Sequence, residues 1–153
     1  MMARLSIPLF SLILVSAQAA DENWTQFRGP TVRGHLDRAE LPTAWSEASI
    51  KWKAALKGTG QSSPVNWGEK LYLTSASADG RERYVTCLSA ADGSLVWEDI
   101  ITCEKPEEIH AMNSHATPSC STDGKFVVAF FGPAGLHAYD LAGKKQWSLV
   151  LGE

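Results

Sequence analysis

The stretch that decides the fold is Leu88-Ser89-Ala90-Ala91-Asp92-Gly93-Ser94-Leu95-Val96-Trp97. Its Asp-Gly pair supplies the positive φ angle of a tight hairpin, and the apolar run that follows is typical of a β-strand. A version one residue shorter ends at Trp147, 50 residues after Trp97, and reads Tyr139-Asp140-Leu141-Ala142-Gly143-Lys144-Lys145-Gln146-Trp147. The chain therefore contains an internal repeat, and a repeat of this length indicates a propeller or a solenoid.

The sequence around each copy shows the same order of four short strands. We expect strands at 62–65, 70–75, 84–88 and 94–100 in the first copy, and at 116–119, 125–131, 136–141 and 144–151 in the second. Turn signals separate them at intervals of about eight to twelve residues, as in all-β proteins. We predict an all-β fold with two four-stranded antiparallel blades, one over residues 62–101 and one over 115–151.

Residues 50–56 repeat only the last strand of this unit, with Trp52 lying 45 residues before Trp97. A strand before the first whole blade is what closure of a propeller ring requires, so we predict a closing strand at 50–56. Residues 126–131 are apolar on both alternating faces, which predicts that their blade packs between two neighbours. The sequence thus predicts part of a β-propeller over residues 50–153.

The first 49 residues fall into two parts. Residues 1–19 combine an early basic residue, an apolar run of about eleven residues and a small-residue site near Ala19, which predicts a cleaved signal peptide. The apolar run is too short for a membrane span, so we expect a periplasmic or extracellular protein. Residues 20–49 combine glycines and prolines with Trp24 and Trp45, which predicts an irregular arm fastened by aromatic side chains.

Composition and charge exclude several classes of protein. The chain has 153 residues, 44% of them hydrophobic, and a formal net charge of −3. Such a composition indicates a globular domain, and the acidic balance argues against nucleic-acid binding. An odd number of cysteines with no zinc-type spacing predicts buried thiols or a single disulfide rather than a redox or metal role. These cysteines are Cys87, Cys103 and Cys120.

The repeat resembles the tryptophan-docking repeat of pyrroloquinoline quinone (PQQ) propellers, in which a glycine makes the hairpin and a tryptophan packs between blades. Residues 24–30 and 41–46 are similar to the entry arm of exported bacterial PQQ-like propeller proteins. The resemblance therefore covers nearly all of the expected mature chain, and it implies a structural role for the residues of the repeat. These residues are Trp52, Gly93, Trp97, Gly143 and Trp147.

Two departures limit what the resemblance implies. A closed propeller of four to eight blades needs at least about two hundred residues, so we expect the chain to be the N-terminal fragment of a longer propeller. Its remaining blades, or self-association, would cover the exposed blade faces. Quinone dehydrogenases of this superfamily hold PQQ and calcium on the propeller axis, in several cases above an adjacent cysteine pair that this sequence lacks. We therefore predict no cofactor for this chain, and PQQ with calcium only for a full-length form.

Residues 107–115 connect the two blades, are rich in polar side chains and are the segment that most resembles a binding site. A loop on a rigid scaffold often binds a ligand, and two histidines five residues apart could converge on one. The alternative, which we favour, is that these side chains satisfy backbone groups where the chain enters the second blade. The candidate ligand loop consists of His110, Asn113, Ser114 and His115.

We assign no catalytic residues and no metal ligands, because the sequence carries no nucleophile elbow, phosphate-binding loop or H-E-x-x-H motif. We expect a non-catalytic binding or scaffolding module for an unknown protein or small-molecule ligand. Two alternatives stay open. One is a fragment of a PQQ-dependent alcohol or sugar dehydrogenase, and the other is a propeller that resembles an outer-membrane protein assembly factor.

Overall fold

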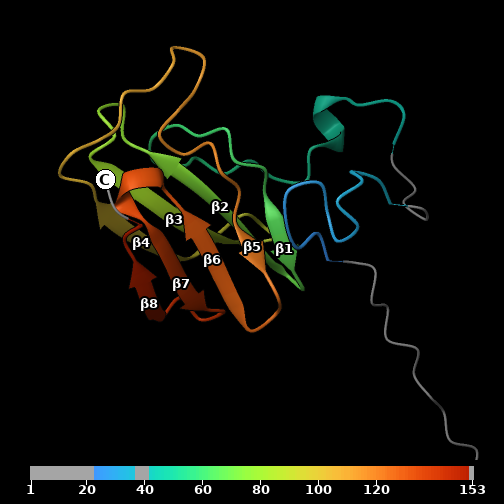
Figure 1. Cartoon of the computed structure of the whole chain (residues 1–153). Coiled ribbons are helices and arrows are strands. Elements are labelled where there is room, and N and C mark those ends of the chain that lie inside the picture. Colours follow the sequence, from blue (N-terminus) through green and yellow to red (C-terminus); the bar gives the residue numbers. More distant parts are fainter. Residues whose placement is uncertain (1–22, 37–41, 152–153) are drawn as a thin grey trace, which may run out of the picture.

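The computed structural model describes residues 23–36 and 42–151, and the predicted signal peptide lies outside these ranges. The described chain folds into two four-stranded antiparallel sheets (Figure 1). The first sheet has the order β1-β2-β3-β4 and the second has the order β5-β6-β7-β8. The predicted all-β fold with two four-stranded blades is thus confirmed. Within the described residues, no helix is long and apolar enough to cross a membrane.

The elements follow one another in the order that the repeat predicts. The first sheet consists of β1 (Val65–Trp67), β2 (Lys70–Ala76), β3 (Glu82–Ser89) and β4 (Leu95–Thr102). The second consists of β5 (Ser121–Thr122), β6 (Phe126–Phe130), β7 (Leu136–Asp140) and β8 (Lys145–Leu149). Two short 3-10 helices, η1 (Glu47–Ser49) and η2 (Gly132–Ala134), lie before β1 and between β6 and β7.

The registers of the two sheets match residue by residue. Across the first sheet, Tyr72 pairs with Cys87 and Cys87 with Trp97. Across the second sheet, the corresponding row is Val128, Ala138 and Trp147. A β-bulge follows the middle residue of each row, between β3 and β4 and again between β7 and β8. Because even this irregularity recurs at the same place, the two sheets are copies of one structural unit.

The core lies between the two sheets. On the first sheet, Tyr72, Val85 and Cys87 share one face, and on the second sheet Val127 and Tyr139 share the opposing face. All five belong to one buried cluster, to which Cys120 and Phe131 also contribute. Burying apolar area on both sheets is the main source of stability for such a pair of blades. The sheets approach each other most closely along β1 and β5, which are in contact (Figure 1).

The first strand of each sheet begins later than the sequence predicts. β1 begins at Val65, directly after Pro64, and β5 begins at Ser121, three residues after Pro118. Proline has no backbone N–H for a strand ladder, so pairing starts only beyond it. The predicted strands at 62–65 and 116–119 are therefore displaced toward the C-terminus.

The predicted closing strand at 50–56 does not form a strand in the described structure. A strand exists only when its backbone pairs with another strand, and residues 50–56 belong to neither of the two sheets. The segment instead runs along the outer face of the first sheet, where residues 54–57 line a hollow together with Thr86, Leu88 and Glu98. Its tryptophan nevertheless occupies the position that the repeat predicts, as described below.

Candidate functional site

Two tryptophans dock in the same way on two successive glycine turns. The Trp52 indole donates a hydrogen bond to the Ala90 carbonyl (3.0 Å), and its ring covers Gly93 so closely that a Cβ there would collide with it. The Trp97 indole donates to the Leu141 carbonyl (3.3 Å), and a Cβ on Gly143 would lie 2.5 Å from the Trp97 ring. Both glycines also have positive φ angles, which side chains disfavour.

The second of these contacts joins the two sheets. Trp97 lies on β4 of the first sheet, and its ring lies between the rings of Tyr72 and Tyr139, with centroids 6.0 and 5.5 Å away. Aromatic rings at these separations attract each other beyond their buried area. Trp97 therefore links its own sheet to β7 and to the turn of the next sheet.

An ion pair reinforces this junction at its outer side. The Tyr139 hydroxyl donates to the Asp99 carboxylate (2.7 Å), and Lys145 lies 2.8 Å from the same carboxylate. Burial raises the pKa of Asp99, but the hydrogen bonds from Lys145 and Tyr139 outweigh burial, so that the pKa lies below its usual value. Burial, together with this hydrogen bond, raises the pKa of the Tyr139 phenol. Asp99 is therefore ionised and Tyr139 neutral at physiological pH.

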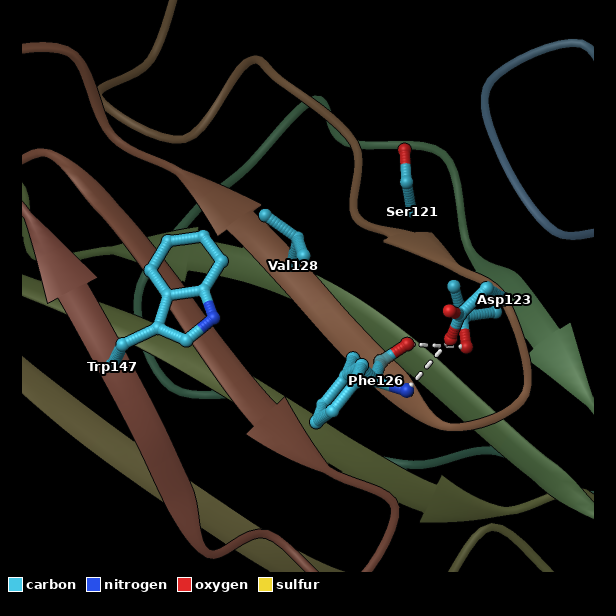
Figure 2. A pocket seen from close by; sticks show the side chains of 6 residues that line it. Ser121, Asp123, Phe126, Val128 and Trp147 are labelled. Carbon is cyan, nitrogen blue, oxygen red and sulfur yellow. Dashed lines mark hydrogen bonds between the residues drawn. The ribbon is translucent and has the colours of Figure 1, made fainter.

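The third tryptophan of the repeat has different surroundings. Trp147 lies on β8 at the register position of Trp97, but 47% of its surface is exposed. Together with Phe126 and Val128 of β6 it lines a hollow of about 300 Å³ on the outer face of the second sheet (Figure 2). Phe130 and Leu149 are exposed as well. We call the surface formed by Phe126, Val128, Phe130, Trp147 and Leu149 the open face.

The segment between the sheets is fastened by a buried arginine. The Arg83 guanidinium is fully buried and donates to the Glu107 carboxylate (2.7 Å) and to the His115 carbonyl (2.5 Å). The His115 ring packs over Gly80, where a Cβ would lie 2.6 Å from it, and its Nδ1 atom lies 3.7 Å from Glu107. Because a buried charge needs a partner, Arg83 holds both ends of residues 107–115 against the first sheet.

The outer part of the same segment is fastened by Gln61. Its side-chain amide donates to the Met112 carbonyl (2.5 Å) and accepts from the Ser114 N–H (2.9 Å). Its backbone N–H also donates to the Ala116 carbonyl (3.1 Å). Residues 107–116 are thus held by hydrogen bonds along most of their length, with the side chain of Met112 exposed.

The structure does not gather the candidate ligand loop around one point. His110 is exposed and its Nδ1 accepts from the Met112 N–H, while the Ser114 hydroxyl accepts from the Ala116 N–H. Asn113 is exposed, and its N–H donates to the His110 carbonyl. His115 packs inward, as described above. These contacts agree with the interpretation that the polar residues satisfy the backbone at the entry to the second sheet.

The free edges of β1 and β5 are relevant to the question of whether the quinone cofactor implied by the resemblance could bind here. In a propeller the blades surround a central channel, and the edges along which neighbouring sheets approach most closely face it. Here the backbone N–H groups of Asn66 and Thr122 on those edges donate to the carbonyls of Trp24 and Thr25. These two N–H groups are therefore already bonded to the arm and are not available to a quinone. Within the described ranges, no three His, Cys, Asp or Glu side chains converge as metal ligands would.

All three cysteines are buried and free in the structure. Burial raises the pKa of Cys87 to about 11 and that of Cys120 to about 12. A thiol with so high a pKa is protonated at physiological pH and reacts slowly. Both side chains pack within the core between the sheets, which agrees with the prediction of buried thiols.

Sequence reasoning missed Arg83 and Gln61, which organise the segment between the sheets. A signal for Arg83 exists, because it alternates along β3 with Val85 and Cys87 and therefore shares their buried face. No comparable signal exists for Gln61. It lies in irregular chain before β1, and its partners lie more than 50 residues away.

The chain is similar in sequence to a known protein family. A sequence model of the family described as outer membrane protein assembly factor BamB matches residues 35–153. Among curated proteins, a sequence search finds no match. The family match spans both sheets and the segment that carries Trp52.

Proposed function

Because the chain belongs to the PQQ-repeat propeller family of the outer membrane protein assembly factor BamB, we propose that it is an exported, non-catalytic scaffold that holds a partner against its second sheet. The observation that carries this proposal is the contrast between Trp97 and Trp147. The same repeat position is docked on a glycine turn in one sheet and exposed beside a hollow in the other.

The open face has the composition of an interaction surface. Aromatic side chains such as Phe126 and Trp147 are enriched at protein interfaces, and an exposed apolar patch of this kind marks a site that another surface covers. The partner would present a glycine turn with a free carbonyl, since the docked tryptophans use that combination. A further propeller blade, or a protein that imitates one, has this chemistry.

A role in assembly at the outer membrane is the form of scaffolding that the family name favours. It requires export, which the predicted signal peptide at 1–19 would provide, and it requires a protein partner. The dehydrogenase alternative requires space for PQQ and calcium on the propeller axis, beside the free edges of β1 and β5. The arm contacts at Asn66 and Thr122 count against such a space.

The test places a photoreactive amino acid at position 126 on the open face and, as a matched control, at the exposed position 51 on the opposite side of the first sheet. Irradiation of the source cells should link position 126, and not position 51, to a defined polypeptide. A link to a component of the membrane-assembly machinery would support the assembly role. Equal labelling at both positions would contradict a specific open face.

A second experiment addresses the dehydrogenase alternative. PQQ and Ca²⁺ are added to the purified protein, excess cofactor is removed, and quinone absorbance and dye reduction with alcohols or aldoses are measured. The proposal predicts that neither quinone absorbance nor dye reduction remains. Retained quinone together with dye reduction would overturn it.

A further inference from the structure

The first strand of each sheet is an edge strand. β1 pairs with β2 and β5 pairs with β6, so the other edge of each carries backbone groups without a strand partner. Such groups need hydrogen-bond partners and can accept another extended segment. β1 and β5 are in contact, so these two edges lie beside each other and together form one surface.

Three consecutive residues of the N-terminal arm bond to this surface. The Asn66 N–H donates to the Trp24 carbonyl (2.8 Å), and the Trp24 N–H donates back to the Asn66 side-chain oxygen (2.6 Å). One residue further on, the Thr25 carbonyl accepts from the Thr122 N–H of the second sheet (2.9 Å). One residue earlier, the Asn23 side chain accepts from the Gly68 N–H (2.7 Å).

The arm is shaped for this contact by its own sequence. The Gly29 N–H donates to the Gln26 carbonyl (2.9 Å), which turns the chain back after Thr25. The Trp24 ring then lies against Gly29, where a Cβ would be 2.8 Å away. Figure 1 shows this part of the arm, in blue, beside β1. A preformed turn reduces the entropy lost when the extended residues bind.

We propose that the free edges of β1 and β5 form a peptide-binding site, and that Asn23–Thr25 of the arm is its ligand in cis. The ligand class is an extended peptide that presents two successive backbone carbonyls and a side-chain amide. The bound arm joins both blades and closes these edges to any other extended ligand. This site lies on the free edges of β1 and β5, away from the open face, and it does not depend on the proposed scaffold function.

The test uses backbone hydrogen exchange of the full chain, followed by NMR. The Asn66 and Thr122 amides depend on the arm for their hydrogen bonds, whereas the Leu73 amide lies in the middle strand pair of the first sheet. In the wild type all three amides should be protected. In an Asn23→Ala and Trp24→Ala double variant, exchange at Asn66 and Thr122 should rise at least tenfold while exchange at Leu73 stays the same.

A matched control comes from the same arm. Phe27 is 58% exposed, and Phe27→Ala should leave all three exchange rates unchanged. If the double variant loses protection at Leu73 as well, Asn23→Ala alone is measured, and it should still raise exchange at Asn66 and Thr122 selectively. Unchanged protection at these two amides in both Asn23 variants would overturn the proposal.

A synthetic peptide of residues 23–34 provides the second readout. Added to the double variant, it should restore protection at Asn66 and Thr122, and the same peptide with Trp24→Ala should not. Restoration by both peptides, or by neither, would contradict a specific peptide site.

Discussion

The two sheets carry a tryptophan at the same register position, but only one of these side chains is docked. Trp97 of β4 lies between two tyrosine rings and over Gly143, whereas Trp147 of β8 is half exposed on the open face. The sequence signal is the same at both places, because each tryptophan follows a glycine turn by a few residues. The difference teaches that the repeat encodes a side chain ready to dock, and that a neighbouring turn decides whether it is buried.

The largest expected effect comes from removing the two tryptophans separately. Trp97→Ala deletes a ring from the junction between the sheets and should lower the free energy of unfolding by about 3 kcal/mol. Trp147→Ala removes a half-exposed ring and should lower it by less than about 1 kcal/mol. Urea unfolding of both variants measures the difference. Equal losses would show that the two positions are not energetically distinct.

The next effect concerns the segment that joins the sheets. Glu107→Gln leaves the buried Arg83 guanidinium without its charged partner and should lower the free energy of unfolding by about 2–3 kcal/mol. A fully buried pair would lose more, but the Glu107 side chain is about one-third exposed. Glu47→Gln, which alters the exposed pair with Lys53, is the matched control and should leave stability unchanged. The account of this segment would fail if both variants were as stable as the wild type.

A pair of glycines separates backbone strain from docking. Gly143 and Gly68 both have positive φ angles, but a Cβ would meet Trp97 at Gly143 and nothing within 4 Å at Gly68. Alanine at either position should cost about 1 kcal/mol for the strained backbone. Gly143→Ala should cost about a further 1–2 kcal/mol, because it displaces the Trp97 ring. Thermal unfolding of the two variants checks this, and equal melting temperatures would argue against tight docking.

The smallest effect is on the pH dependence of stability. The folded-state pKa of Asp99 lies below the unfolded value of about 3.9, so the unfolded chain binds more protons in this range. The stability that the Asp99 carboxylate contributes is therefore present above about pH 4 and is lost as the pH falls through the folded-state pKa. Wild type and Asp99→Asn should differ most at neutral pH and converge in acid, as followed by urea unfolding between pH 7 and pH 2.5. A difference that stays constant with pH would contradict the assignment.

More of the fold than of the candidate site can be predicted from the sequence. The turn at Gly93 and the strand that ends at Trp97 have a strong local signal, because positive φ angles and apolar runs are written in neighbouring residues. The predicted starts of β1 and β5 lie too early in the sequence, because Pro64 and Pro118 delay strand pairing. Residues 50–56 are not paired as a strand in the described structure, and their role as a closing strand stays a prediction, because pairing depends on a partner that local sequence does not reveal.

The contacts that organise the site are mostly long-range, and this is why the sequence did not reveal them. Arg83 reaches Glu107 and His115, Gln61 reaches the segment around Met112, and Trp24 reaches Asn66. The two polar groups of each pair lie far apart in the sequence and meet only when the sheets are packed. The candidate ligand loop is a prediction from composition, and composition does not distinguish a ligand site from polar side chains that satisfy the backbone.

The most direct test of the account is the hydrogen exchange of the tryptophan indole N–H groups in a single preparation of the protein, with each signal assigned by a Trp→Phe variant. The account predicts slow exchange for Trp52 and Trp97, whose indoles donate to Ala90 and Leu141, and fast exchange for Trp147. Equally slow exchange of Trp147, or fast exchange of Trp97, would contradict the claim that Trp97 is docked on a glycine turn while Trp147 is exposed on the open face.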